Sequence, residues 1–116
     1  MRAEAAKYLL DALNACRAIC QFTAGMTTDA YREDLLVRSA VERQFEILGE
    51  AFSRLDKLDP SYRRSSPALG DIIGMRNRII HGYDSVDAAI VWDAVQNRVP
   101  QLRAWLETLS LEPGAV

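Results

Sequence analysis

Residues 69–83 read LGDIIGMRNRIIHGY, and this stretch indicates the fold of the whole chain. Its hydrophobic residues recur with the period of an α-helix over residues 69–80, and Gly82 marks a turn after the helix. Arg76 falls within the hydrophobic face, where an unpaired guanidinium would cost free energy. His81, the only histidine of the chain, lies near the end of the helix. The stretch therefore predicts a helix that carries one arginine in need of a partner and one histidine close to its last turn.

Small and polar residues form a second stripe along the same predicted helix. Gly70, Gly74, Asn77 and His81 are spaced four, three and four residues apart, so they share one face. Glycine at such positions often marks a place where another backbone approaches closely. We therefore expect Gly70 and Gly74 to lie at close helix contacts, and the substitution Gly74→Leu to disrupt the packing there.

Hydrophobic residues with the same period predict three further helices, over residues 3–24, about 34–58 and about 84–109. Pro100 lies inside the last of these, and because the hydrophobic period resumes after it, we expect a kink there. No stretch has the alternating pattern of a β-strand. The expected fold is therefore all-α, a bundle of four main helices. We expect a single domain over residues 1–116, with about 110–116 as a frayed tail.

Short polar residues indicate where these helices begin. Thr27 or Thr28 is expected to cap a short helical turn that precedes the long helix. Ser66, with Pro67 directly after it, is expected to cap the helix that carries Arg76. Asp84 is expected to cap the last helix in the same way, because its carboxylate can accept a bond from a free backbone N–H.

The composition limits the classes of function. The chain has 14 Lys and Arg against 16 Asp and Glu, a net charge of −2, so any contact with RNA has to be local. Cys16 and Cys20 lie one helical turn apart, and a reduced pair in the core is favoured over metal ligands because only one histidine accompanies them. No hydrophobic run approaches transmembrane length, and the first residues lack a signal-peptide core. A cytoplasmic location, with no membrane partner, is the expectation.

Four charged residues form a row along the predicted helix 34–58: Arg38, Glu42, Glu46 and Glu50. One interpretation is a charged ridge that water solvates. The other is that Glu46 or Glu50 neutralises Arg76 from a facing helix. Gly49, in the same helix at a cost of about 1 kcal/mol relative to alanine, is expected at a close crossing of two helices.

Arg76 and His81 together suit phosphate chemistry without a metal. Arginine stays protonated, so it can hold a phosphate and neutralise the charge that builds up on phosphorus. The histidine side chain, with a reference pKa near 6.5, can give or take a proton at neutral pH. Cleavage of RNA through its own 2′-hydroxyl needs both a base and an acid, and one chain has a single histidine, so a homodimer is expected. The alternative is a capped helix end with a histidine on the surface.

The motif Arg76-Asn77-x-x-x-His81-x-Tyr83 resembles the signature of the HEPN superfamily and, within it, of the HepT-like toxin family. Residues 40–51 (AVERQFEILGEA) resemble the family's long helix, and VWD and VPQL at 91–93 and 99–102 resemble its last helix. The resemblance therefore extends from the first helix to about Leu109, and it implies a HEPN-type bundle. Family members often carry a tryptophan where this chain has Leu69, a difference that concerns packing and not the chemistry.

This resemblance implies a metal-independent endoribonuclease, the toxin of a toxin–antitoxin pair, with its cleft at a homodimer interface. Arg76 would bind the phosphate, His81 would be the acid and base, and Asn77 would support them. The implied partner is a minimal nucleotidyltransferase antitoxin that adenylylates Tyr83, and RNA is the implied substrate, with no cofactor. A tyrosine that merely packs after the helix end is the alternative for Tyr83.

Two other classes of function stay open. HEPN domains also serve as non-catalytic scaffolds or substrate-presenting subunits of nucleotidyltransferases. The acidic balance of this chain suits that role at least as well as it suits RNA binding. A helical module that only dimerises is the remaining alternative.

Overall fold

The computed structural model of the chain describes residues 1–66, 68–82 and 86–111. These residues contain no β-strand, which confirms the all-α prediction. They form seven helices: α1 (Ala3–Thr23), α2 (Thr28–Glu33), α3 (Leu35–Leu58), α4 (Tyr62–Ser65), α5 (Leu69–His81), α6 (Ala88–Asn97) and α7 (Val99–Glu107).

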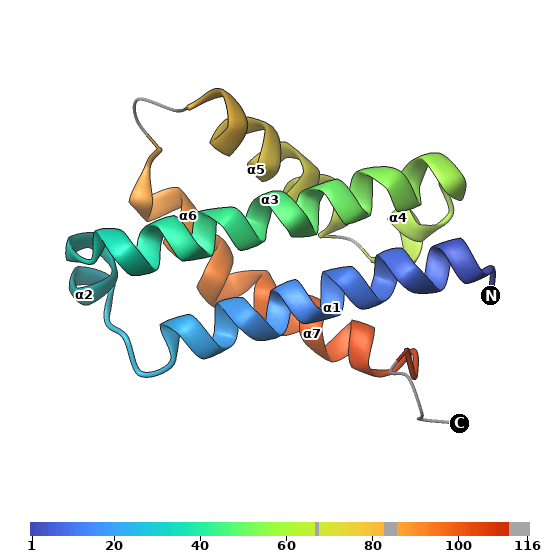
Figure 1. The fold of residues 1–116 in the computed structure, drawn as a ribbon, viewed down its shortest axis with the longest axis horizontal. Helices are drawn as coiled ribbons and strands as arrows, with labels where there is room; N and C mark the ends of the chain where they lie inside the picture. The colour runs from blue at the N-terminus through green and yellow to red at the C-terminus, as the bar shows by residue number, and fades with distance from the viewer. Residues whose placement is uncertain (67, 83–85, 112–116) are drawn as a thin grey trace.

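The two long helices α1 and α3 run antiparallel, side by side, and form the centre of the bundle (Figure 1). α5 lies against α3, while α6 and α7 pass behind the long helices and α7 packs on α1 (Figure 1). The molecule measures 41 × 28 × 19 Å, so its thinnest dimension fits two helices of about 10 Å each. None of the helices in the described ranges is both long and apolar enough to cross a membrane.

The long helix α3 follows closely from its sequence. The carboxylate of Asp34 accepts a hydrogen bond from the Val37 N–H at 3.0 Å and so caps the first turn. Residues three or four positions apart then point into the core, where each fully buried side chain contributes about 1.5–3 kcal/mol. These buried residues are Val41, Phe45, Leu48, Phe52 and Leu55. The helix ends before Asp59-Pro60, as the sequence predicts.

Two of the expected helix caps are wrong. Thr27 does cap α2, where its hydroxyl accepts from the Ala30 N–H at 3.1 Å. Ser66, however, does not cap α5: its hydroxyl is buried without a partner, and its backbone carbonyl accepts from the Leu69 N–H instead. Pro67 lies outside the described residues.

The cap of α6 is Asp87, whose carboxylate accepts from the Ala89 N–H at 2.9 Å. The expected cap, Asp84, lies three residues too early and outside the described residues.

Pro100 begins a helix instead of kinking one. The segment expected as a single helix over about 84–109 is interrupted at Arg98, and Pro100 lies in the first turn of α7. Proline lacks an N–H and its ring displaces the carbonyl four residues earlier, which breaks a helix interior but is harmless in a first turn.

Both cysteines are free thiols, and Cys16 lies in the core. Burial raises the pKa of the Cys16 thiol to about 12, so it stays protonated and unreactive at neutral pH. The core interpretation is confirmed for Cys16, while Cys20 is only partly buried.

The three glycines expected at helix contacts behave differently. A Cβ atom at Gly49 would collide with the Cβ of Arg76 on α5 and lie 2.8 Å from its Cγ, so this glycine does mark a close crossing. A Cβ at Gly74 meets nothing within 4 Å, and one at Gly70 meets only the end of the Arg63 side chain. The expectation that Gly70 and Gly74 mark close helix contacts is therefore wrong within the described part of one chain, where both residues line an open groove.

The same substitution should have opposite effects at two of these positions. Gly49→Ala should lower the free energy of unfolding, because overpacking costs about 1–3 kcal/mol and exceeds the gain in helix propensity of about 1 kcal/mol. Gly74→Ala should raise it by about 0.5–1 kcal/mol, since the new methyl group occupies open space. Urea unfolding of both variants at one protein concentration measures the two effects. A Gly49→Ala protein more stable than the wild type would contradict the tight crossing.

Candidate active site

The helix α5 is held on α3 by one hydrophobic face. Leu69, Ile72 and Ile79 are buried in the core. Ile80, which the helical period places on the same side of the helix, is 41% exposed. The buried face of α5 is therefore narrower than its hydrophobic composition suggests, and Ile79 is the one buried residue of the last turn.

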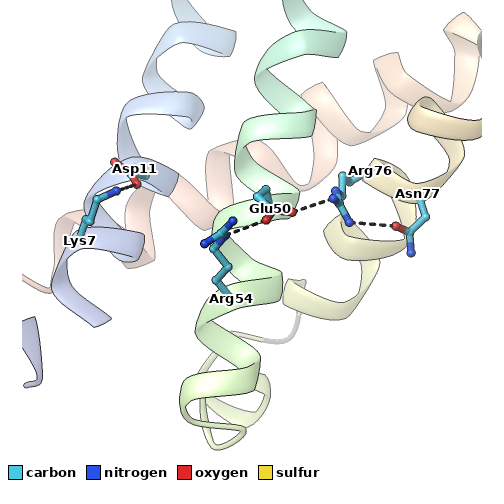
Figure 2. A network of polar contacts seen from close by, with 6 residues as sticks. All are labelled: Lys7, Asp11, Glu50, Arg54, Arg76 and Asn77. Carbon is cyan, nitrogen blue, oxygen red and sulfur yellow. Dashed lines mark hydrogen bonds and ion pairs between the residues drawn. The ribbon is translucent and has the colours of Figure 1, made fainter. Parts of the chain in front are cut away.

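Arg76 lies where α5 crosses α3, and it has the carboxylate partner that its position requires. Its Nη2 atom lies 2.7 Å from Oε2 of Glu50, and the arginine side chain is 26% exposed (Figure 2). The other carboxylate oxygen of Glu50 accepts a hydrogen bond of 2.7 Å from Nε of Arg54. Glu46 pairs with Arg43 on its own helix at 3.0 Å. Of the two predicted partners, Glu50 is confirmed and Glu46 is not.

The crossing itself determines where the guanidinium lies. Because Gly49 has no side chain, the aliphatic part of Arg76 can lie directly on the α3 backbone. Glu50, the next residue, then meets the head of the side chain. The Nε atom of Arg76 is buried without an acceptor, so the two terminal nitrogens make the polar contacts that are seen.

Asn77 gives the guanidinium a second contact. Its Oδ1 accepts a bond from Nη1 of Arg76 at 3.4 Å, which is long for a hydrogen bond (Figure 2). Asn77 therefore contacts Arg76, its neighbour on the same helix, and its supporting role in the reaction stays a prediction.

The charges around Glu50 favour its ionised form. The hydrogen bond from Arg54 and the charge of Arg76 hold the pKa of Glu50 below its ordinary value of 4.5. At neutral pH this carboxylate is therefore charged and lies between two guanidinium ions. The three side chains together carry a net charge of +1, so the cluster remains attractive to a phosphate.

The row of charged residues on α3 is not one solvated ridge. Arg38 donates to the backbone carbonyl of Arg32 at 3.3 Å, and its Nε is buried without a partner. Glu42 is partly buried, and burial raises the pKa of its carboxyl group. Only the Glu50 end of the row reaches Arg76.

His81 is the last residue of α5, and its side chain is exposed. Five residues separate it from Arg76, which in a helix means a rise of about 7.5 Å and a rotation of about 140°. One chain therefore presents Arg76 toward α3 and His81 to a different side. Asn77 contacts Arg76 and lies one turn before His81, so it is the residue between them. Tyr83 lies outside the described residues.

Arg54 is the residue of this cluster that the sequence pattern did not single out. Its spacing of four residues from Glu50 on a helix is a signal that was present, since such pairs face each other. The sequence pattern indicated Glu50 as a partner of Arg76, but it did not indicate Arg54 as the second cation that pairs with the same carboxylate.

The bundle and the motif together define a domain of the HEPN class. Residues 12–109 match the family described as Ribonuclease HepT-like, and the chain belongs to this family. No solved structure matches the chain significantly.

Three proteins with ribonuclease names are similar to this chain over most of its length. A protein of Methanocaldococcus jannaschii named "Putative RNase" is 33% identical over 93 residues, which cover 80% of this chain and 76% of the relative. A protein of Thermococcus cleftensis named "Probable ribonuclease HepT" is 30% identical over 104 residues, 88% of this chain and 92% of the relative. Another "Putative RNase", from Caldanaerobacter subterraneus, is 30% identical over 95 residues, which cover 82% of this chain and 84% of the relative.

Proposed function

We propose that this chain is a metal-independent endoribonuclease, the toxin of a toxin–antitoxin pair that acts on RNA in the cytoplasm. The observation that carries the proposal is the match of residues 12–109 to the Ribonuclease HepT-like family, a stretch that includes Arg76 and His81. The ribonuclease names of the relatives support it. The whole chain, residues 1–116, acts as a single domain in this proposal.

In the proposed reaction, the 2′-hydroxyl oxygen of a nucleotide attacks the adjacent phosphorus. His81 removes the proton of this hydroxyl, and a protonated histidine supplies a proton to the 5′-oxygen as its bond to phosphorus breaks. Arg76 binds the phosphate and neutralises the charge that develops in the transition state. The products are a 2′,3′-cyclic phosphate and a free 5′-hydroxyl, so the atoms and protons balance without a metal.

The second histidine in this proposal comes from a second copy of the chain. The stripe of Gly70, Gly74, Asn77 and His81 supports a twofold contact, because Gly74, Asn77 and His81 are exposed and nothing in the described ranges lies within 4 Å of a Cβ built at Gly74. A groove of about 330 Å³ borders the stripe and is lined by Gly70, Gly74 and the exposed Ile90, among others. A helix of a partner chain could fill this groove and bring both His81 side chains to one cleft.

Tyr83 is proposed as the residue through which a minimal nucleotidyltransferase antitoxin controls the enzyme. A nucleotide attached two residues from His81 would add bulk and negative charge where the substrate phosphate has to bind. Co-expression with the cognate nucleotidyltransferase should therefore raise the intact mass by one or more nucleotides. The variant Tyr83→Phe should keep the unmodified mass. If the nucleotidyltransferase abolished the toxicity of the chain while the mass of the chain stayed unchanged, inhibition would occur by another route.

A non-catalytic scaffold for a nucleotidyltransferase remains the second candidate. The net charge of −2 favours it, since a protein that binds RNA gains from positive charge. In that case the chain would bind its partner protein and would leave RNA intact.

Cleavage of a labelled RNA in the presence of a metal chelator separates the two candidates. The wild-type chain should produce fragments that end in a 2′,3′-cyclic phosphate, and His81→Ala should produce none. An oligonucleotide with 2′-deoxyribose at every position is the substrate control, because it lacks the attacking hydroxyl. A folded wild-type protein that leaves RNA intact would favour the scaffold.

A further inference from the structure

We propose that Glu50 and Arg54 are positioning residues, which hold the guanidinium of Arg76 in one orientation for the phosphate of the substrate. The inference rests on the proposed function, because it assigns Arg76 a phosphate to bind. It concerns two residues of α3 that do not themselves contact the reacting atoms.

The first support is that α3 holds Arg76 at two adjacent points. Gly49 receives the aliphatic part of the side chain, and Glu50 binds the head through the 2.7 Å contact. A free arginine side chain samples many rotamers, so fixing it in advance removes an ordering cost from the reaction itself. Donors that are already oriented stabilise developing charge better than donors that must reorient.

The second support is the way that Glu50 divides its two oxygens. Oε2 faces Arg76, and Oε1 accepts from Nε of Arg54, so each oxygen has one arginine partner. A carboxylate that faced Arg76 alone would cancel its charge and weaken the attraction for a phosphate. With Arg54 present, the three groups keep a net positive charge, and Glu50 itself is held on both sides.

This arrangement predicts a specific split between binding and turnover. Glu50→Gln removes a negative charge beside the phosphate site, so charge alone would leave RNA binding unchanged or make it tighter. Loss of orientation, in contrast, should lower kcat by about ten- to a hundred-fold. If Glu50 instead competes with the phosphate for Arg76, the same variant should be as active as the wild type or more active.

The chain offers a matched control for this substitution. Glu46 lies one turn earlier on α3 and is paired at 3.0 Å with Arg43. No contact joins that pair to Arg76 among the described interactions. Glu46→Gln therefore removes an equal charge and a similar surface ion pair without touching Arg76.

The tether itself can be tested without any cleavage. In ¹⁵N-labelled protein at neutral pH, rotation of the Arg76 guanidinium should be slow in the wild type and in Glu46→Gln, and fast in Glu50→Gln. Arg54→Gln should leave it slow, because Glu50 remains beside Arg76. Equal rotation rates in the wild type and in Glu50→Gln would overturn the tether, whether or not the chain cleaves RNA.

Kinetics on a single RNA oligonucleotide then test the positioning role. We expect Glu50→Gln to lower kcat, with KM unchanged or lower. Arg54→Gln should mainly raise KM, because a cation is lost. Glu46→Gln should have the kcat and KM of the wild type. A Glu50→Gln enzyme with the kcat of the wild type would overturn the role even if the tether is real. A wild type that cleaves no RNA would refute the proposed function, and with it the kinetic role of Glu50, while the rotation measurement still decides the tether.

Discussion

Replacing Arg76 with lysine should lower kcat/KM for RNA cleavage by about a hundred-fold or more, although the positive charge is kept. The two terminal nitrogens of Arg76 contact Glu50 and Asn77, and each of them carries a second N–H that can be offered to a phosphate, whereas Nε is buried. Lysine has one nitrogen at the end of its chain, so it cannot hold the carboxylate and a phosphate in the same fixed geometry. Cleavage of one labelled oligonucleotide by both proteins measures the difference.

Arg103 is the matched control for this substitution. It also pairs with a carboxylate, that of Glu107 at 2.9 Å, but it lies on α7 and not where α5 crosses α3. Arg103→Lys should therefore cleave RNA at the wild-type rate, and both lysine variants should unfold at the temperature of the wild type. An Arg76→Lys enzyme with full activity would mean that positive charge alone is sufficient and that the fixed fork contributes nothing.

The sequence predicted best those helices whose beginning and end depend on residues a few positions away. The long helix α3 has a capping aspartate, a regular hydrophobic period and a proline after its end, and each of these acts within a few residues. Arg76 was also placed correctly, because a guanidinium on a hydrophobic face needs a carboxylate whatever the fold is. That requirement leaves few candidates in the facing helix, and Glu50 is one of them.

The errors arose where tertiary contacts decide. Gly74 and Gly49 look alike in sequence, yet of these two only Gly49 is in close contact with another helix, and helical period alone cannot tell which stripe is covered. Ile80 lies on the hydrophobic side of α5 and yet is 41% exposed, because helical period does not show how much of that side the neighbouring helices cover. The helix break at Arg98 depended on whether Pro100 falls in an interior or in a first turn, which the hydrophobic period does not distinguish.

The proposal of a two-chain site rests on the same geometry. Transesterification requires a base for the 2′-hydroxyl and an acid for the leaving 5′-oxygen, and each chain has a single histidine. Within one chain, His81 lies about 140° around the helix from Arg76, and Gly74 lies open on the stripe that contains His81. A twofold axis along this stripe would place two His81 and two Arg76 side chains in one cleft.

Dilution of the wild type with inactive chains should therefore reduce activity more than in proportion. After random exchange with an equal amount of His81→Ala, only about one quarter of the dimers keep both histidines, so the activity per total amount of protein should fall to about one quarter of the wild-type value. Independent chains, or composite sites that use one His81 and one Arg76, would keep about one half. For the same reason a mixture of His81→Ala with Arg76→Ala should stay inactive although dimers form.

A His81→Ala chain that also carries Gly74→Leu should no longer inhibit, because the leucine would block the stripe without disturbing its own fold. Undiminished inhibition by that double variant would place the interface elsewhere, and a monomer that cleaves RNA at the full rate would refute the two-chain site.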